Sequence, residues 1–263
     1  MKSRCAILAA LTAGAVPCVA TGQVWDNVAD FSHDLNPSGA WTLGKAASRP
    51  VTGVDLAPFS WCSELGADGL WFWVPVHGTT PWIAQNVTDL PIGFGGDQVA
   101  PPRTQLCRPG SAGQNAVLRW TSPDAATVAV EARFGGVVVD PDPTTTDVAV
   151  LHNGVELFAA VVEGVGAGAT AVLEVQVDKG DVIDFAVGYG TNGSNANDAM
   201  ALHVVITAPC PADFDQSGFV DTDDFTAFVT AFEAGTDDAD FDGTGFVDTD
   251  DFTAFVLAFE AGC

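Results

Sequence analysis

Hydrophobic and polar residues alternate along many short segments between about residues 23 and 208. The clearest alternation lies at 126–134, 170–177, 181–188 and 201–207, where Val, Ile, Leu, Phe or Ala occupies every second position. A period of two is typical of antiparallel strands that bury one face. Because this region shows no helical window of any length, the pattern predicts an antiparallel β-sandwich of jelly-roll type.

Turn residues stand where a hairpin between such strands needs them. Asn153-Gly154 separates two alternating runs, and this dipeptide tolerates the positive φ angles of a type I′ turn. Gly180 marks a second tight turn. Both positions therefore predict hairpins between neighbouring strands.

The C-terminal fifth of the chain follows a helical period instead. The segments 212–235 and 239–262 align without gaps and differ at only three positions. In each segment, apolar residues lie at i, i+3, i+4 and i+7, which is one face of a helix. These stripes are Phe225, Phe228, Val229 and Phe232, and Phe252, Phe255, Val256 and Phe259. Since neither helix could bury its stripe alone, we expect the two helices to pack on each other.

Composition divides the chain into three parts. Two prolines in 207–212 interrupt the strand pattern and mark a boundary. At the N-terminus, Lys2 and Arg4 precede an apolar run that ends in small residues, as in a secretory signal peptide. The predicted organisation is a signal peptide at 1–22, a β-sandwich at 23–208 and a repeat domain at 209–263. A membrane anchor is the alternative for the first segment, but its apolar run is short for a hydrocarbon layer of ~30 Å. We therefore expect a secreted protein, extracellular or on the cell surface.

The charge balance limits the partners. The 263 residues include 34 acidic and 9 basic side chains, for a net charge of −25. Such a chain repels nucleic acids and anionic membrane surfaces, so we expect neither as a partner. No segment after the signal peptide is long and apolar enough to span a membrane.

Four cysteines follow the predicted signal peptide. They are Cys62, Cys107, Cys210 and Cys263. An even number in an exported protein indicates two disulfides, with three possible connectivities. The pairs Cys62–Cys107 and Cys210–Cys263 are favoured because each then stays within one predicted domain. Zinc is the alternative, although no C-x-x-C spacing supports it.

Each C-terminal repeat begins with an acidic dodecapeptide that has the spacing of a calcium loop. In such a loop, alternate residues point oxygen atoms inward and a glycine at position 6 makes the sharp turn, here Gly218 or Gly245. Position 8, Val220 or Val247, is expected to pair the two loops through a short β-bridge. The predicted metal ligands are Asp213, Asp215, Ser217, Phe219 (through its carbonyl), Asp221 and Asp224, and Asp240, Asp242, Thr244, Phe246 (through its carbonyl), Asp248 and Asp251.

Two calcium ions would therefore offset the crowded carboxylates, one in each loop. The hydroxyl residues at position 5, Ser217 and Thr244, are weaker ligands than a carboxylate. We accordingly expect dissociation constants toward the weaker part of the range, roughly 10⁻⁶ to 10⁻³ M.

The loops differ from an ordinary EF-hand in two ways. No helix can precede the first loop, and position 12 is Asp rather than Glu. A loop followed by a helix, duplicated, with Asp at position 12, resembles the type I dockerin family over about 52 residues. That resemblance implies two bound calcium ions and docking onto a cohesin domain of a scaffold or cell-surface protein. It also implies that positions 10 and 11 help to choose the partner. These are Thr222, Asp223, Thr249 and Asp250.

This chain departs from the dockerin pattern in detail. Position 5 is usually Asp or Asn in that family, and a charged Asp at position 11 does not match the familiar cellulosomal cohesins. Positions 10 and 11 are identical in both repeats, which would allow a partner to bind in either of two orientations.

The predicted sandwich contains all seven tryptophans of the chain. Trp71 and Trp73 lie on the same side of one predicted strand and are the expected carbohydrate-binding pair, because aromatic faces stack on sugar rings. Burial in the core is the alternative. The segments 30–44, 107–110 and 177–206 loosely resemble a β-sandwich domain of exported bacterial proteins that is similar in shape to carbohydrate-binding jelly rolls. The resemblance implies a glycan as a ligand.

No catalytic motif stands out. The four histidines are scattered without the spacing of a metal site or a triad, and acidic pairs are too plentiful to single out a glycosidase dyad. We therefore expect a secreted calcium-binding modular protein rather than an enzyme. A structural surface protein that uses calcium only for folding is one alternative, and a polysaccharide-degrading enzyme is the other.

Overall fold

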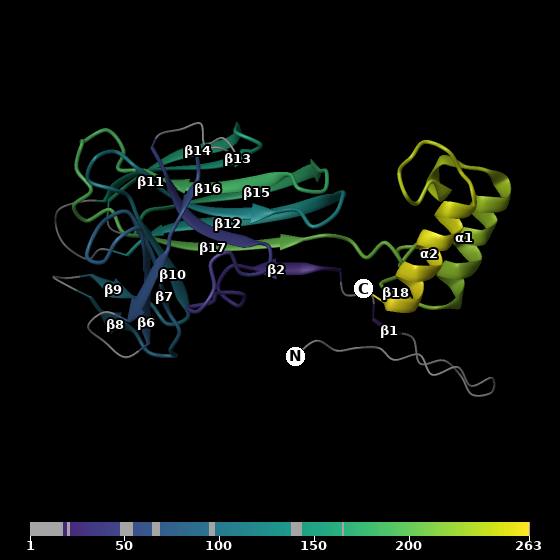
Figure 1. Ribbon diagram of the computed structural model, residues 1–263, viewed down its shortest axis with the longest axis horizontal. Coiled ribbons are helices and arrows are strands. Elements are labelled where there is room, and N and C mark those ends of the chain that lie inside the picture. Colours follow the sequence, from purple (N-terminus) through teal and green to yellow (C-terminus); the bar gives the residue numbers. More distant parts are fainter. Residues whose placement is uncertain are drawn as a thin grey trace. The chain divides into compact units, whose positions relative to one another are not determined.

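The computed structural model describes residues 22–47, 55–64, 69–94, 98–137, 144–164 and 166–262, and the backbone of one short strand, β1 (Cys18–Val19) (Figure 1). Almost all of the predicted signal peptide lies outside the described residues. The chain divides into two compact units. The larger unit is Trp25–Ile206, and the smaller one contains the chain from Thr207 onward with the segment before Trp25.

The larger unit is mainly β and antiparallel, as the alternation predicts. Its first large sheet has eight strands in the order β15-β12-β17-β10-β7-β6-β5, and β2 pairs with β17 beside that path. The strands are β2 (Val24–Asp26), β5 (Trp61–Glu64), β6 (Leu70–Val74), β7 (Trp82–Asn86), β10 (Thr104–Arg108), β12 (Ala126–Gly136), β15 (Gly168–Val177) and β17 (Met200–Thr207).

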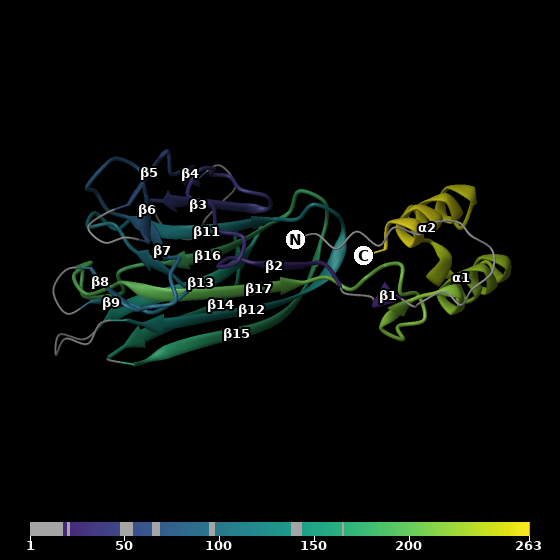
Figure 2. The same cartoon turned by 90° about the horizontal axis from the view of Figure 1, so that it is seen from below.

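The second large sheet has six strands in the order β14-β13-β16-β11-β3-β4 (Figure 2). These are β3 (Trp41–Ala46), β4 (Ala57–Pro58), β11 (Asn115–Thr121), β13 (Thr145–His152), β14 (Val155–Glu163) and β16 (Val182–Val187). A small ribbon pairs β8 (Ile92–Gly93) with β9 (Val99–Ala100). Trp25 of the first large sheet contacts Trp120 of the second edge-on, with ring centroids 5.0 Å apart.

The alternating residues point as predicted. Along β12, Val128, Val130, Ala132 and Phe134 are buried, whereas Thr127, Ala129 and Arg133, at the alternate positions, are exposed. The predicted hairpin at Asn153-Gly154 joins β13 to β14, with φ angles of 50° and 81°. These are the positive angles that a type I′ turn requires.

The predicted disulfide Cys62–Cys107 is wrong, because both cysteines are free thiols. Register places them in one row across the sheet, as Cys62↔Trp73, Trp73↔Ile83 and Ile83↔Cys107. Three strand spacings, about 14 Å, separate the two residues. A disulfide requires Cα atoms within roughly 7 Å.

The other predicted disulfide concerns the smaller unit. Cys210 takes part in a disulfide. Cys263 lies outside the described residues, so its pairing with Cys210 stays a prediction.

The smaller unit is built on two helices, α1 (Thr222–Ala234) and α2 (Thr249–Ala261), with a 3₁₀ turn η1 (Asp237–Ala239) between them. The phenylalanine stripes pack on each other as predicted: the rings of Phe228 and Phe255 stack at 4.0 Å, and both are fully buried. Phe214 and Phe241, at position 2 of the loops, add edge-on contacts to these rings. Neither helix is long and apolar enough to cross a membrane.

The predicted β-bridge between the two loops is wrong. Val220 belongs to β18 (Phe219–Val220), which pairs with β1 instead, and Val247 packs in the hydrophobic cluster around Phe228 and Phe255. The apolar residue at position 8 therefore pairs with a strand in the first repeat and packs in the hydrophobic cluster in the second.

A buried ion pair crosses the second large sheet of the larger unit. Arg119 of β11 donates hydrogen bonds from Nε and an Nη to the carboxylate of Asp184 on β16, at 2.6 and 2.8 Å, and the Asp184 side chain is fully buried. Burial raises the pKa of Asp184, whereas the hydrogen bond and charge of Arg119 lower it. The carboxylate therefore depends on the guanidinium to stay ionised in the sheet.

We predict that Arg119→Leu destabilises the protein by about 3–5 kcal/mol, because it leaves the Asp184 carboxylate buried without its cation. The double variant Arg119→Leu/Asp184→Leu should recover most of that loss. Chemical denaturation of the whole protein measures both. As a control, Lys179→Gln removes the same charge from the exposed pair with Asp124 and should cost no more than about 1 kcal/mol. Equal losses in Arg119→Leu and Lys179→Gln would contradict the assignment.

Candidate metal centres and sandwich surfaces

Three carboxylates converge in the first acidic loop. Oxygen atoms of Asp213, Asp215 and Asp224 all lie within 4.8 Å of one another. The N–H of Gly218 donates to both oxygens of Asp213, at 3.3 and 3.0 Å, so the glycine turn orients the first ligand. Gly218 has a φ of 87°, a left-handed angle that glycine adopts without strain.

The second loop repeats this arrangement. Oxygens of Asp240, Asp242 and Asp251 also lie within 4.8 Å of one another. The N–H of Gly245 donates to Asp240 Oδ2 at 2.8 Å, whereas Asp240 Oδ1 is buried without a hydrogen-bond partner. A buried carboxylate oxygen without a partner is costly, and a cation among the three carboxylates would supply one. The residues of this loop thus fit a bound cation.

Position 12 connects each loop to its helix. Asp224 accepts hydrogen bonds from the N–H groups of Asp215 and Asp221, at 3.0 and 2.8 Å, and is fully buried. Asp251 does the same with Asp242 and Asp248, at 3.0 and 2.7 Å. These backbone hydrogen bonds lower the pKa of Asp251, the bond from Asp248 contributing most. The carboxylate is therefore held ionised by the loop itself.

The remaining predicted ligands, at loop positions 5, 7 and 9, lie between these carboxylates in the sequence, and the residue at position 9 also caps a helix. Asp221 and Asp248 cap α1 and α2, each accepting the N–H two residues later at 2.8 Å. The Ser217 hydroxyl lies 3.4 Å from the Phe219 carbonyl oxygen, so positions 5 and 7 of the first loop are neighbours. In the second loop, Thr244 N–H donates to Asp242 at 3.1 Å, and Phe246 is exposed.

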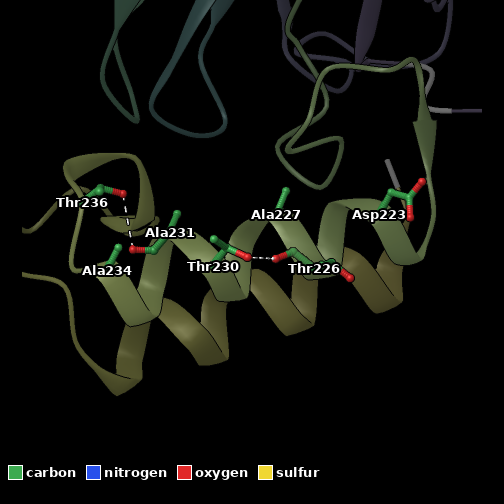
Figure 3. Close-up of a pocket in the computed structure, with 7 residues that line it drawn as sticks. All are labelled: Asp223, Thr226, Ala227, Thr230, Ala231, Ala234 and Thr236. Carbon is green, nitrogen blue, oxygen red and sulfur yellow. Dashed lines mark hydrogen bonds between the residues drawn. The ribbon is translucent and has the colours of Figure 1, made fainter.

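The predicted partner-binding residues Thr222, Asp223, Thr249 and Asp250 are all exposed, in the first turns of the helices. Asp223 lies at one end of a shallow groove of about 590 Å³ along α1 (Figure 3). Small side chains line the groove. They are Thr226, Ala227, Thr230, Ala231, Ala234 and Thr236.

The predicted carbohydrate-binding pair of tryptophans is wrong as a surface pair. Trp73 is buried and donates its indole N–H to the Ser32 carbonyl at 2.8 Å. Trp71 is half-buried and stacks on His33, with ring centroids 4.4 Å apart. The segment around residues 32–33 therefore covers this side of β6.

A different tryptophan is exposed on the sandwich. Trp61 begins the edge strand β5 and is 47% exposed. His77 lies edge-on to its ring, with centroids 5.4 Å apart. No local pattern distinguishes Trp61 from the other tryptophans, because alternation does not reveal strand order or which strand lies at the edge of a sheet.

Comparison with known proteins finds no family model and no curated protein that matches this chain. Among solved structures, a CBM51 carbohydrate-binding module from Clostridium perfringens in complex with methyl-galactose is similar over 57% of this chain and 95% of its own, with 11% identity and a TM-score of 0.33. A family 35 carbohydrate-binding module from Clostridium thermocellum is similar over 65% of this chain and 99% of its own, with 10% identity and a TM-score of 0.26.

The isomalto-dextranase of Arthrobacter globiformis T6 complexed with panose is similar over 64% of this chain, with 15% identity and a TM-score of 0.24. The matched region spans only 23% of that enzyme. Because these TM-scores are low, the fold of this chain rests on the sheets described above, and no ligand follows from the likeness.

A buried acid, Asp198, lies just before β17. Its Oδ1 accepts the N–H of Thr145 at 3.1 Å. Burial raises the pKa of Asp198 to about 6, although the Thr145 N–H, the Thr146 hydroxyl and the charge of Arg108 lower it. The folded protein therefore binds a proton here over a pH range in which the unfolded chain does not.

We predict that Asp198 makes the protein less stable as pH rises from about 4 to about 6, since the raised pKa favours the folded state only while the carboxyl is protonated. Asp198→Asn should remove this slope and stabilise the protein at pH 7 by up to about 3 kcal/mol. Denaturation of the wild type and the variant at several pH values measures the difference. Parallel curves across that range would contradict the assignment.

Proposed function

We propose that the C-terminal repeats bind two calcium ions and form a dockerin-like module that attaches the chain to a cohesin-like partner outside the cell. The observation that carries the proposal is the convergence of three carboxylates in each loop, with the buried Oδ1 of Asp240 left without a partner. Ca²⁺ prefers such oxygen ligands and takes six to eight of them.

The residues present fit the ion by chemistry. The Asp residues at positions 1, 3 and 12 already converge, and the position 5 hydroxyl, the position 7 carbonyl and the position 9 carboxylate are the remaining candidates. When bound, Ca²⁺ supplies two positive charges that offset the repulsion of these carboxylates. The hydroxyl residues Ser217 and Thr244 suit the weaker affinities of extracellular modules, which agrees with the predicted secretion.

The second part of the proposal is that the repeats dock onto a partner protein. The supporting features are the open groove along α1 and the exposed pairs Thr222-Asp223 and Thr249-Asp250. The two helices are nearly identical in sequence, but Thr230 in α1 corresponds to the exposed Leu257 in α2. A partner that fits the small-residue face of α1 would therefore meet a larger side chain on α2.

We predict that calorimetric titration of the whole protein detects two calcium sites. Asp215→Asn and Asp242→Asn each remove one charged ligand, so each should weaken one site by roughly tenfold or more and leave the other unchanged. Asp238→Asn is the matched control, because it removes the same charge from the exposed η1 turn outside both loops. No heat of binding in the wild type, or an equal effect of Asp238→Asn, would refute the calcium sites.

The sandwich is proposed as a carbohydrate-binding domain of jelly-roll type, so that the whole chain is a binding protein and not an enzyme. The exposed ring of Trp61, with His77 beside it, is the observation that favours this second function. An indole face presents a large apolar surface of the kind that a sugar ring covers.

We predict that Trp61→Ala abolishes the retardation of the protein in gels that contain soluble neutral polysaccharides, tested with xylan, mannan and galactan. Trp61→Tyr should retain part of it, since an aromatic face remains. The melting temperature should change little because Trp61 is exposed. Leu157→Ala, an exposed apolar residue on β14, serves as the control. The proposal fails if none of the polymers retards the wild type, or if Trp61→Ala migrates like it.

A further inference from the structure

Besides the groove along α1, a pocket lies on the sandwich, on other strands than the one that carries Trp61. It has a volume of about 280 Å³ and spans β12, β17 and β10, three neighbouring strands of the first large sheet. Its lining includes Arg103, Thr104, Arg133, Gly135, Ala201 and His203. None of the residues that line it is acidic, but the imidazole of His203 lies 3.4 Å from a carboxylate oxygen of Asp26. The pocket therefore brings two arginines and a histidine together, each of which also has a carboxylate neighbour outside the lining.

The two arginines have capacity for a ligand. Arg103 donates Nε–H to Asp89 at 2.8 Å, and Arg133 pairs through an Nη with Glu131. The arginine side chains are 59% and 63% exposed, so these ion pairs hold them only weakly. A guanidinium carries five N–H donors in a planar fork, a geometry that matches a carboxylate or another oxyanion.

The backbone at Arg103 supports a role for its side chain. Arg103 has a φ of 49°, in the left-handed region that glycine and asparagine occupy at lower cost. Such conformations in other residues cost of order 1 kcal/mol and concentrate at functional sites. An arginine at this position is therefore unfavourable for the fold and places its charge beside the pocket.

Gly135 explains why the pocket is open. It lies within β12, and glycine inside a strand stabilises the strand less than a larger residue does. Its φ angle lies outside the left-handed region, so the backbone would accept another residue. A Cβ added there would meet nothing within 4 Å. The missing side chain thus leaves space beside Arg133 that a valine would fill.

We propose that this pocket binds an oxyanion group on a saccharide, either a carboxylate or a sulfate ester, between Arg103 and Arg133 with His203 beside them. The saccharide part rests on the proposed carbohydrate binding, whereas the anion part rests on the pocket alone. The pocket would then give the sandwich a preference for acidic over neutral sugars.

Calorimetric titration of the whole protein at low salt tests this with four probes: trigalacturonate, its methyl ester, galactose 6-sulfate and inorganic sulfate. At least one of the two acidic saccharides should bind, whichever source of the anion is correct, and the neutral methyl ester should bind at least about tenfold more weakly than trigalacturonate if the carboxylate is the source. Arg103→Gly and Arg133→Gln should each weaken that binding by roughly tenfold or more, since each removes a charge-assisted hydrogen bond. Added NaCl should weaken it as well.

Three variants separate loss of the site from loss of the fold. Arg103→Gly relieves the left-handed strain and should not lower the melting temperature, and Gly135→Val should fill the pocket, abolish binding and leave the protein folded. Lys179→Gln, which removes a charge from an exposed pair outside the pocket, should bind like the wild type.

Inorganic sulfate that binds through Arg103 while no saccharide binds would support the anion pocket and count against carbohydrate binding by the sandwich. The pocket is refuted if no anion binds, if the methyl ester binds as well as trigalacturonate, or if Lys179→Gln has the same effect as Arg103→Gly.

Discussion

The smaller unit depends on two buried carboxylates, Asp224 and Asp251. Each accepts backbone N–H groups from the start of its loop and from the cap of its helix, so a single side chain links the loop to the helix. In Asp251 these hydrogen bonds also lower the pKa of the carboxyl group. The acidic loop therefore has its shape from its own backbone, and the convergence of the remaining carboxylates follows from that shape. This is why the loops fit a cation although their charges repel one another.

Local patterns were enough to predict most of the strands and helices and the convergence of carboxylates in the acidic loops. The period of two along β12, the Asn153-Gly154 turn and the stripes around Phe228 and Phe255 each describe neighbours within one element or hairpin, and the structure agrees with all of them. The carboxylates that converge are among those chosen from loop spacing. In each case the relevant residues lie within about a dozen positions of one another, so no knowledge of the tertiary arrangement was needed.

The errors concern which strands are neighbours and which faces are covered. Cys62 and Cys107 share a row of the sheet but are three strands apart, a distance that sequence separation does not reveal. Trp73 alternates correctly, yet the segment around Ser32 covers its side of the strand. Val220 pairs with a residue of β1, and no local pattern predicts this pairing. Alternation assigns residues to two faces, but tertiary packing decides which face meets solvent.

Net charge is similarly a poor guide to a single site. A charge of −25 excludes broad attraction to polyanions, and 14 of the 34 acidic residues lie in 212–263, in the smaller unit. Screening at physiological salt acts over about 8 Å, so exposed charges beyond that distance contribute little at the pocket formed by Arg103 and Arg133. What an anion meets there is set by the nearest groups, which are the two arginines and their exposed carboxylate partners Asp89 and Glu131. The proposed cation sites in the loops and the proposed oxyanion site on the sheet are therefore compatible in one acidic protein, because each would be governed by its nearest charges.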